Sequence, residues 1–161
     1  MGMDYASVWC LLQCAFPGFT DRAIKVLSVA REQADALHQK LVTPEHVLQA
    51  LAAVEPGVGR VALERLGIDF EREGAQIAAI VQVVPRMLPD DYHSFSDDAE
   101  RLIAEAKVAS KELGHRYVDT EHLVCGLLRC GPCAAGNFLR TRRITVERFR
   151  EKALGLVADN E

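Results

Sequence analysis

The chain has 161 residues, of which 49% are hydrophobic and 26% are charged, and its net charge is −4. This composition is that of a single globular domain with a sizeable core, and the mild acidity gives no reason to expect a nucleic-acid partner. The five cysteines are an odd number without a framework spacing, which is typical of a reducing compartment and predicts a cytoplasmic protein.

The chain opens with an amino-terminal extension, residues 1–18. Residues 8–12 are apolar, but no Lys or Arg precedes them, so the basic region of a signal peptide is missing. The apolar run is also too short to span a bilayer, and no membrane partner is predicted. We expect a short helix over about 4–15 that covers the domain or a partner and ends at the turn residues 16–18.

From residue 19 onward the sequence contains an internal repeat, in which similar residues recur at a constant offset of 76 positions. The matching pairs include Phe19 with Phe95, Glu45 with Glu121, and Ile68 with Ile144. Repeat 1 is expected at about 19–82 and repeat 2 at about 95–157, joined by a linker at about 83–94, within one domain of residues 19–161. Two helical units that cannot each bury an apolar face should pack on one another about a pseudo-twofold axis.

The sequence of repeat 1 predicts four helices. Apolar residues recur every three or four positions over 23–37, which indicates a long first helix. Thr43 is a favourable N-cap with Pro44 at the first helical position, so a second helix begins there. A turn at 55–59 leads into a third helix, and a fourth runs from about residue 69.

Repeat 2 follows the same helical pattern after a linker that contains Pro85 and Pro89, which disfavour a helix. Asp119 is the expected N-cap of its second helix. No stretch alternates at period two for long enough to predict a strand. The fold class is therefore all-α, with two pseudo-twofold-related four-helix repeats and about eight core helices.

The second copy carries the most characteristic sequence, which reads ELGHRYVDTEHL over 112–123 and GLLR over 126–129. Together, the two copies resemble the amino-terminal domain of the Clp ATPases, the double Clp-N repeat, and are most similar to the ClpC type. The resemblance covers about residues 19–157. It implies a module that receives substrates and adaptor proteins, which in that family lies ahead of two ATPase modules.

The chain contains no Gly-x-x-x-x-Gly-Lys-Ser/Thr motif and therefore no Walker phosphate loop. The resemblance is consequently to a stand-alone Clp-N protein, an accessory subunit or decoy that shares ligands with a full-length unfoldase. It implies a non-enzymatic protein without a cofactor, whose partners are protein substrates or adaptors and a Clp ATPase.

The resemblance also implies ligand-binding residues. Domains of the ClpC type bind phosphorylated arginine at two symmetry-related sites, which by motif match are Glu45 with Thr20 and Glu121 with Ser96. The carboxylate would pair with the guanidinium, and helix-start amides would receive the phosphate. The alternative is that both glutamates are surface residues of a first helical turn, where they interact favourably with the helix dipole.

Two departures from the family pattern distinguish the repeats. Repeat 1 has His38 and Gln39 where the family has Gly and His, and repeat 2 has Arg142 and Arg143 where repeat 1 has Leu and Gly. The altered loop is expected to impair the first site, so Glu45→Ala should weaken phosphoarginine binding less than Glu121→Ala.

The histidines that follow the two glutamates, His46 and His122, do not predict a metal site. Zinc would need further ligands at defined spacing, so we interpret both as packing and hydrogen-bonding residues.

Cys130-Gly131-Pro132-Cys133 has the letters of the thioredoxin active site. That motif indicates a redox enzyme only beside a strand–helix unit, whereas this one falls in a turn between two expected helices. A reversible disulfide is the more plausible chemistry. Cys125 is expected in the core, and a zinc site that joins Cys10 and Cys14 to the pair stays open as an alternative.

Five arginines gather late in the chain. A solvated helix face is the expected interpretation, and a docking patch for an acidic partner is the alternative; the five are Arg140, Arg142, Arg143, Arg148 and Arg150.

Three functional hypotheses follow from the sequence. The first is a non-catalytic binding module of a Clp system. The second is a thiol redox protein or sensor that uses Cys130 and Cys133. The third is a structural accessory subunit that docks through the amino-terminal segment.

Overall fold

The structure, a computed structural model, describes residues 10, 12–39, 41–82 and 94–159. Within them, the predicted all-α fold is confirmed, and the strands β1 (Leu41–Val42) and β2 (Ser94–Phe95) contain two residues each. The helices of the domain are α2 (Asp21–Ala36), α3 (Pro44–Ala53), α4 (Val58–Arg65), α5 (Phe70–Gln82), α6 (Asp97–Glu112), α7 (Thr120–Arg129), α8 (Ala134–Thr141) and α9 (Val146–Asp159).

The helices recur at the offset that the sequence showed. Each of α2 to α5 begins 76 residues before its counterpart among α6 to α9. The first helices of the two repeats are also capped alike, because the side chains of Thr20 and Ser96 each accept a hydrogen bond at 3.1 Å, from the backbone N–H of Ala23 and Ala99. Matching caps and lengths give the two repeats the same local structure.

Short stretches of backbone from the two repeats pair with each other. Strand β1 pairs in parallel with β2, which places Val42 opposite Phe95. A parallel bridge also joins Phe19 to Val118, the residues that lie 76 positions from that pair. Such reciprocal contacts are what a pseudo-twofold relation produces. The segment before the first helix of each repeat thus lies beside the segment before the second helix of the other.

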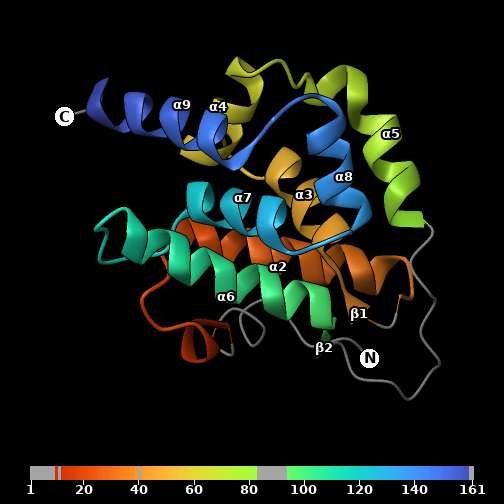
Figure 1. Cartoon of the computed structure of the whole chain (residues 1–161). Coiled ribbons are helices and arrows are strands. Elements are labelled where there is room, and N and C mark those ends of the chain that lie inside the picture. Colours follow the sequence, from red (N-terminus) through yellow and green to blue (C-terminus); the bar gives the residue numbers. More distant parts are fainter. Residues whose placement is uncertain (1–9, 11, 40, 83–93, 160–161) are drawn as a thin grey trace.

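The helices of the two repeats interleave around one core. In Figure 1, α2 and α6 form one face, α3 and α7 lie in the middle, and α4, α5, α8 and α9 form the opposite face. Helix α4 of repeat 1 packs against α7 and α9 of repeat 2, and α8 packs against α3 and α5. A single hydrophobic cluster therefore runs through both repeats, with Leu48, Leu127 and Phe149 fully buried in it.

The described end of the amino-terminal extension packs on the domain. Leu12 is buried, and the ring of Phe16 lies 5.2 Å from that of Phe19 and 5.7 Å from that of Phe95, measured between centroids. This part of the extension covers the junction of the two repeats, while residues 1–9 lie outside the described residues. No helix in the described part of the chain is long and apolar enough to cross a membrane.

Non-glycine residues occupy left-handed backbone positions in each repeat. His38 has φ +52° where its counterpart Gly114 has φ +72°, and Arg143 has φ +59° where its counterpart Gly67 has φ +109°. The altered loop of repeat 1 therefore keeps the backbone conformation that glycine gives in repeat 2. The expectation that this loop impairs the first site is not supported by its backbone.

Candidate functional site

The two Glu-His motifs begin α3 and α7 in the same way. The backbone N–H of Thr43 donates to Nδ1 of His46 at 2.9 Å, and that of Asp119 donates to Nδ1 of His122 at 2.8 Å. Each imidazole is fully buried and satisfies an amide at the helix start. The interpretation of both histidines as packing and hydrogen-bonding residues is confirmed.

The other ring nitrogen of His122 faces a second imidazole. Its Nε2 lies 2.8 Å from Nδ1 of His115, and a carboxylate oxygen of Glu121 completes a group of potential metal ligands within 4.8 Å of one another. Because Nδ1 of His122 accepts a hydrogen bond, the ring proton resides on Nε2 and is donated to His115. Burial lowers the pKa of His122 to about 4, which keeps the ring neutral.

Metal binding fits this arrangement poorly. A metal at Nε2 of His122 would move the proton to Nδ1, where it would oppose the N–H of Asp119. Histidines that bind metal normally donate the second N–H to an acceptor. The cluster is therefore better described as a hydrogen-bonded imidazole pair beside a carboxylate.

The predicted pairing of hydroxyls with glutamates within each repeat is wrong. Thr20 Oγ1 donates to Oδ1 of Asp119 at 2.9 Å, two residues before Glu121. The pairing of β1 with β2 likewise places Ser96 beside the segment that leads into Glu45. The reason is geometric, because the 16 residues of α2 rise about 24 Å and separate Thr20 from the turn before Glu45.

Glu45 is buried and has a structural partner. Its side chain is 8% exposed, and Oε1 accepts a hydrogen bond at 3.1 Å from the N–H of Ala135, in the first turn of α8. The carboxylate thus caps a helix of the other repeat, where the helix dipole also favours negative charge. Glu121 is 3% exposed, so neither glutamate is a surface residue, although both lie in the first turn of their helices as the alternative required.

Glu121 lacks the hydrogen bond that corresponds to the one between Glu45 and Ala135. The N–H of Gly59, the counterpart of Ala135, donates instead to Oγ1 of Thr120 at 3.1 Å. Repeat 1 cannot make this contact, because Pro44 is the counterpart of Thr120. Oε2 of Glu121 is consequently buried without a hydrogen-bond partner, and burial raises the pKa of this carboxyl to about 7.

Arg22 is a candidate that the motif comparison missed. It lies on α2 and is exposed, and its positive charge is close enough to lower the pKa of Glu121, against the larger effect of burial. Its aliphatic stem passes so near Gly57 that a Cβ there would lie 2.6 Å from Cδ of Arg22 and 2.7 Å from Oγ1 of Thr120. The available signal was a mismatch at the 76-residue offset, because Asp98 is the counterpart of Arg22.

The helix-start amides that were expected to receive a phosphate are already used. The N–H of Thr120 donates to Oδ1 of Asp119 at 2.7 Å, and those of Gly59 and Ala23 donate to threonine hydroxyls. The Glu121 site, which we define as Glu121, Thr20, Thr120 and Arg22, therefore offers a carboxylate, hydroxyls and one guanidinium in place of free amides.

Cys130 and Cys133 face each other in the turn between α7 and α8. Both are free thiols, and their Sγ atoms lie 2.9 Å apart. The hydrogen bond from Cys130 lowers the pKa of Cys133 to about 7, with a further contribution from the N–H of Gly136, which donates to Cys133 Sγ at 3.3 Å. The same thiol–thiol hydrogen bond raises the pKa of Cys130. This geometry permits a reversible disulfide between two helices.

The remaining cysteines do not join this pair. Cys125 is buried in the core as predicted, and burial raises its pKa to about 11. Cys10 and Cys14 are exposed on the extension, and among the described residues no cluster of potential metal ligands includes a cysteine. The structure therefore does not support the four-cysteine zinc alternative.

Comparison with known proteins identifies the family. The model of the Clp repeat (R) N-terminal domain matches residues 18–142, which contain both Glu-His motifs and the two cysteines of the α7–α8 turn. The chain belongs to this family. The expected resemblance is thereby confirmed.

Relatives of this Clp N-terminal domain are large proteins. It is 30% identical to the negative regulator of genetic competence ClpC/MecB of Bacillus subtilis and 29% identical to the chaperone protein ClpB of Oceanobacillus iheyensis. Each alignment covers 91% of this chain, and the chain spans 18% of each relative. The Hsp104 N-terminal domain of Candida albicans has the same fold, with a TM-score of 0.71 and 20% identity over 86% of this chain and 90% of that one.

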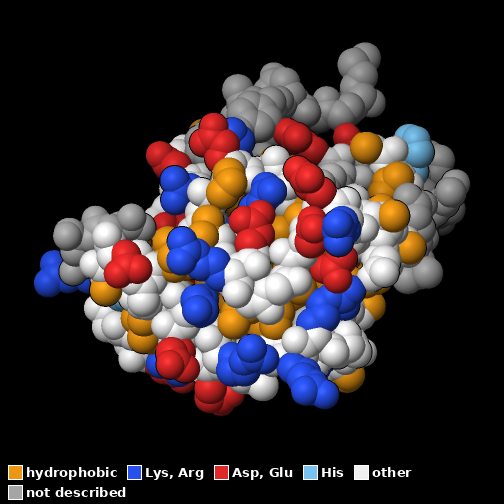
Figure 2. All heavy atoms as spheres, turned by 90° about the horizontal axis from the view of Figure 1, so that it is seen from above, with side chains coloured by type: hydrophobic (Ala, Val, Ile, Leu, Met, Phe, Trp, Pro, Cys, Tyr) orange, Lys and Arg blue, Asp and Glu red, His pale blue; other side chains and the backbone are white. Residues whose placement is uncertain are grey.

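The late arginines of this Clp N-terminal domain are largely engaged within the protein. Arg142 pairs with Glu73 at 2.7 Å, Arg150 pairs with Glu112 at 3.3 Å, and Arg140 donates to backbone carbonyls in the α7–α8 region. Figure 2 shows basic side chains spread over the face of α4, α5, α8 and α9, with acidic ones among them. The expectation of a simple solvated face is therefore only partly correct.

Proposed function

We propose that this Clp N-terminal domain is a non-catalytic protein-binding module of a Clp chaperone or protease system, which receives protein substrates or adaptors. Membership of the family supports this proposal, as does the similarity to ClpC/MecB and ClpB over nearly the whole chain. We further propose that the Glu121 site captures phosphorylated arginine side chains.

The observation that carries the second proposal is the buried Oε2 of Glu121, which has no hydrogen-bond partner. Leaving a carboxylate oxygen unpaired in a low-dielectric environment costs free energy, and native proteins rarely do so without a functional reason. A guanidinium is well suited to this carboxylate, because its parallel N–H groups form charge-assisted hydrogen bonds with both oxygens. Binding would therefore supply the partner that the fold withholds.

Arg22 gives the site a preference for the phosphorylated side chain. An unmodified arginine would bring its positive charge towards the guanidinium of Arg22, which already interacts with Glu121. A phosphoarginine carries a phosphate that can pair with Arg22 while its own guanidinium pairs with Glu121. The hydroxyl of Thr20, which donates to Asp119, lies at the same helix start.

The Glu45 position is less suited to the same ligand. Its Oε1 would have to release the N–H of Ala135, which would leave the start of α8 uncapped. The counterpart of Arg22 is Asp98, whose negative charge would repel a phosphate. We therefore propose one principal phosphoarginine site in this chain, where the family resemblance implies two.

Calorimetric titration with a phosphoarginine peptide tests this function. We expect Glu121→Gln to weaken binding by about tenfold to a hundredfold, the loss typical of one charge-assisted hydrogen bond. The matched variant Glu45→Gln should have a much smaller effect. Arg22→Ala should reduce the preference for the phosphoarginine peptide over its unmodified arginine form.

Two results would contradict the proposal. One is a wild-type protein that binds the phosphoarginine peptide no better than the arginine peptide. The other is a Glu45→Gln variant that loses as much affinity as Glu121→Gln, which would show that the two motifs act equally.

A second candidate function is redox sensing by the Cys130–Cys133 pair, which their close approach and the lowered pKa of Cys133 favour. The two thiols would lose two protons and two electrons to a disulfide oxidant such as oxidised glutathione and form one disulfide bond. Mass spectrometry after mild oxidation should find this link, and Cys125 should stay reduced, because its own pKa is raised to about 11 and the thiol with the lowered pKa, Cys133, is already in contact with Cys130. Insulin reduction that Cys130→Ser abolishes would instead show a catalytic oxidoreductase.

A further inference from the structure

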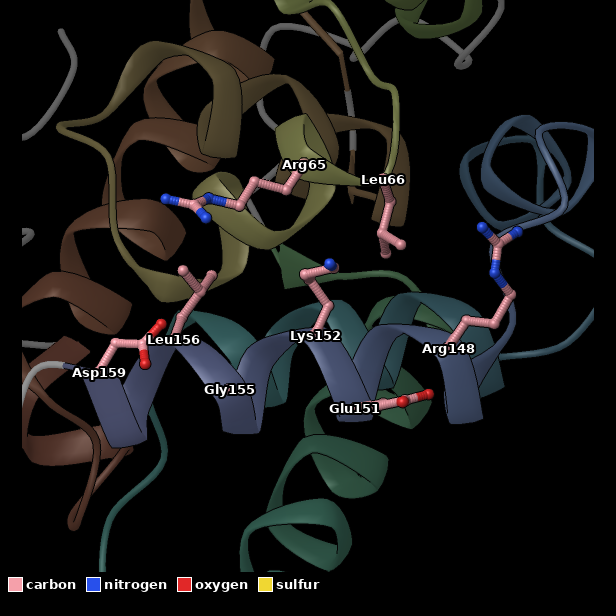
Figure 3. A pocket seen from close by; sticks show the side chains of 8 residues that line it. All are labelled: Arg65, Leu66, Arg148, Glu151, Lys152, Gly155, Leu156 and Asp159. Atoms are coloured by element: carbon pink, nitrogen blue, oxygen red, sulfur yellow. The ribbon is translucent and has the colours of Figure 1, made fainter.

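A groove lies between α4 of repeat 1 and α9 of repeat 2, with a volume of about 420 Å³. Figure 3 shows Lys152 and Leu156 extending from α9 towards Arg65 and Leu66 at the end of α4, with Arg148 at one end of the groove. The groove thus combines two leucines with three basic side chains, which we call its rim, and with the carboxylates of Glu151 and Asp159. It belongs to neither Glu-His motif.

The pseudo-symmetric position between α8 and α5 is filled by a side chain of the protein. Arg142, the counterpart of Leu66, pairs with Glu73 at 2.7 Å and donates to Oε1 of Gln76 at 2.8 Å. Its guanidinium also lies over the ring of Phe138, 3.6 Å from the centroid. Leu66 is too short and apolar to make equivalent contacts. The groove is therefore open on one side of the molecule, where Leu66 and Lys152 replace the bonded pair Arg142 and Gln76.

The cations at the groove have few partners of their own. Neither Arg65 nor Lys152 takes part in an ion pair with another described residue, and Arg148 donates to the backbone carbonyl of Arg143. By contrast, arginines elsewhere on this face, such as Arg60 and Arg142, are held by glutamates. Arg65 and Lys152 therefore remain available for ion pairs with a ligand, although Glu151 and Asp159 lie in the same lining.

The shape and chemistry of the groove indicate what it accepts. Its volume suits a few side chains, and is at the lower end of the range for ligand sites. Leu66 and Leu156 would contact an apolar side chain, while Arg65 and Lys152 would pair with carboxylates. Glu151 and Asp159 also line the groove, so a ligand with a few spaced carboxylates beside an apolar side chain fits its mixed charge better than a continuous polyphosphate backbone, which the net charge of −4 also disfavours.

We propose that this groove binds an acidic linear segment of a partner protein, in which carboxylate residues flank an apolar one. The site is independent of the Glu121 site, because the two share no residue. The interaction combines burial of an apolar side chain with ion pairs at a rim that is open to solvent. Added salt should therefore weaken it.

Fluorescence anisotropy with a labelled peptide of alternating Glu and Leu tests this proposal, with the Lys-for-Glu peptide as the control ligand. The double variant Arg65→Glu/Lys152→Glu should weaken binding of the Glu peptide by about tenfold or more. The double variant Arg72→Glu/Lys107→Glu changes the net charge equally at exposed positions of α5 and α6, and should leave affinity nearly unchanged.

A second test blocks the groove without changing its charge, with one variant in the groove and one matched control elsewhere. Gly155 lines the groove, and a Cβ added there meets no atom within 4 Å, so Gly155→Leu should fill the groove without a clash in the fold. Gly74 on α5 is equally open, and Gly74→Leu is the matched control. Only the first should weaken peptide binding, and Glu121→Gln should bind the peptide as wild type does.

The proposal would be overturned if the Glu and Lys peptides bound equally, or if the groove and control variants lost affinity alike. A single-stranded oligonucleotide that displaced the Glu peptide at equal concentration would also overturn it, in favour of a nucleic-acid site.

Discussion

At the scale of single residues, one substitution separates two otherwise equivalent glutamates. Pro44 precedes Glu45, and Thr120 precedes Glu121. The backbone N–H of Gly59 donates to the hydroxyl of Thr120, so the carboxylate of Glu121 does not cap a helix as the carboxylate of Glu45 does. A residue outside the expected ligand set thus decides which carboxylate is available.

The raised pKa of Glu121 predicts a measurable dependence of stability on pH. The pKa of Glu121 is about 7 in the folded state and its ordinary value is 4.5. As pH rises, the folded protein therefore releases this proton at a higher pH than the unfolded chain does. This contribution to stability is therefore present below about pH 4.5 and is lost as pH rises through about 7. Asp119, the N-cap of α7, raises this pKa and Arg22 on α2 lowers it, while the imidazoles of His115 and His122 lie beside the carboxylate.

Glu121→Gln removes the titration. We expect the variant to be about as stable as wild type near pH 4.5, and more stable by up to about 3 kcal/mol near pH 8, the cost of ionising a carboxyl whose pKa rises from 4.5 to about 7. Urea unfolding at both pH values measures the difference. A variant that is less stable than wild type at both would show that Glu121 is a structural residue of the helix start.

At the scale of the elements, α6 and α7 approach each other closely at Gly126. A Cβ at this position would lie 2.3 Å from the carbonyl oxygen of Leu102. Because the obstacle is backbone, the two helices would have to move apart to accept even a methyl group.

Gly126→Ala should therefore destabilise the domain. Overpacking typically costs about 1–3 kcal/mol, which outweighs the gain of up to about 1 kcal/mol from replacing a helical glycine. The same substitution at the open position Gly155 should be neutral or stabilising, which provides the control. Thermal unfolding of both variants measures the contrast, and a stabilised Gly126→Ala protein would refute the close approach.

The sequence predicted the helices better than it predicted the contacts between them. Apolar periodicity and the caps at Thr43 and Asp119 located α3 and α7, since such signals are local. Strands of two residues carry no periodic signal, so the pairing of β1 with β2, and hence the crossed position of Thr20, could not be found from one sequence. The motif also identified Glu121 but not its burial, which depends on neighbours from the other repeat.

At the scale of the whole molecule, the interleaving of helices makes the two repeats one folding unit. Helix α4 packs on α7 and α9, and α8 packs on α3 and α5. One helix of each repeat is therefore part of the core of the other repeat. Separated repeats would expose the apolar surfaces that these contacts cover.

Neither repeat should therefore fold alone. We expect peptides of residues 19–82 and 95–161 to have much less helix by circular dichroism than the intact chain, because isolated helices of this length are marginal in water. The intact domain should unfold in one cooperative transition. Native helix content in either separate half would contradict the interleaved core.

The central claim is that Oε2 of Glu121 is a buried carboxylate oxygen without a hydrogen-bond partner, and that a cationic group of a ligand supplies that partner. Carbon-13 NMR of the glutamate carboxyl groups, assigned with Glu121→Gln, measures this directly. The account predicts a pKa of about 7 for Glu121 in the free protein and a marked fall when the phosphoarginine peptide is added, because a paired guanidinium favours the ionised form. A pKa near 4.5 in the free protein, or one that the peptide leaves unchanged, would contradict it.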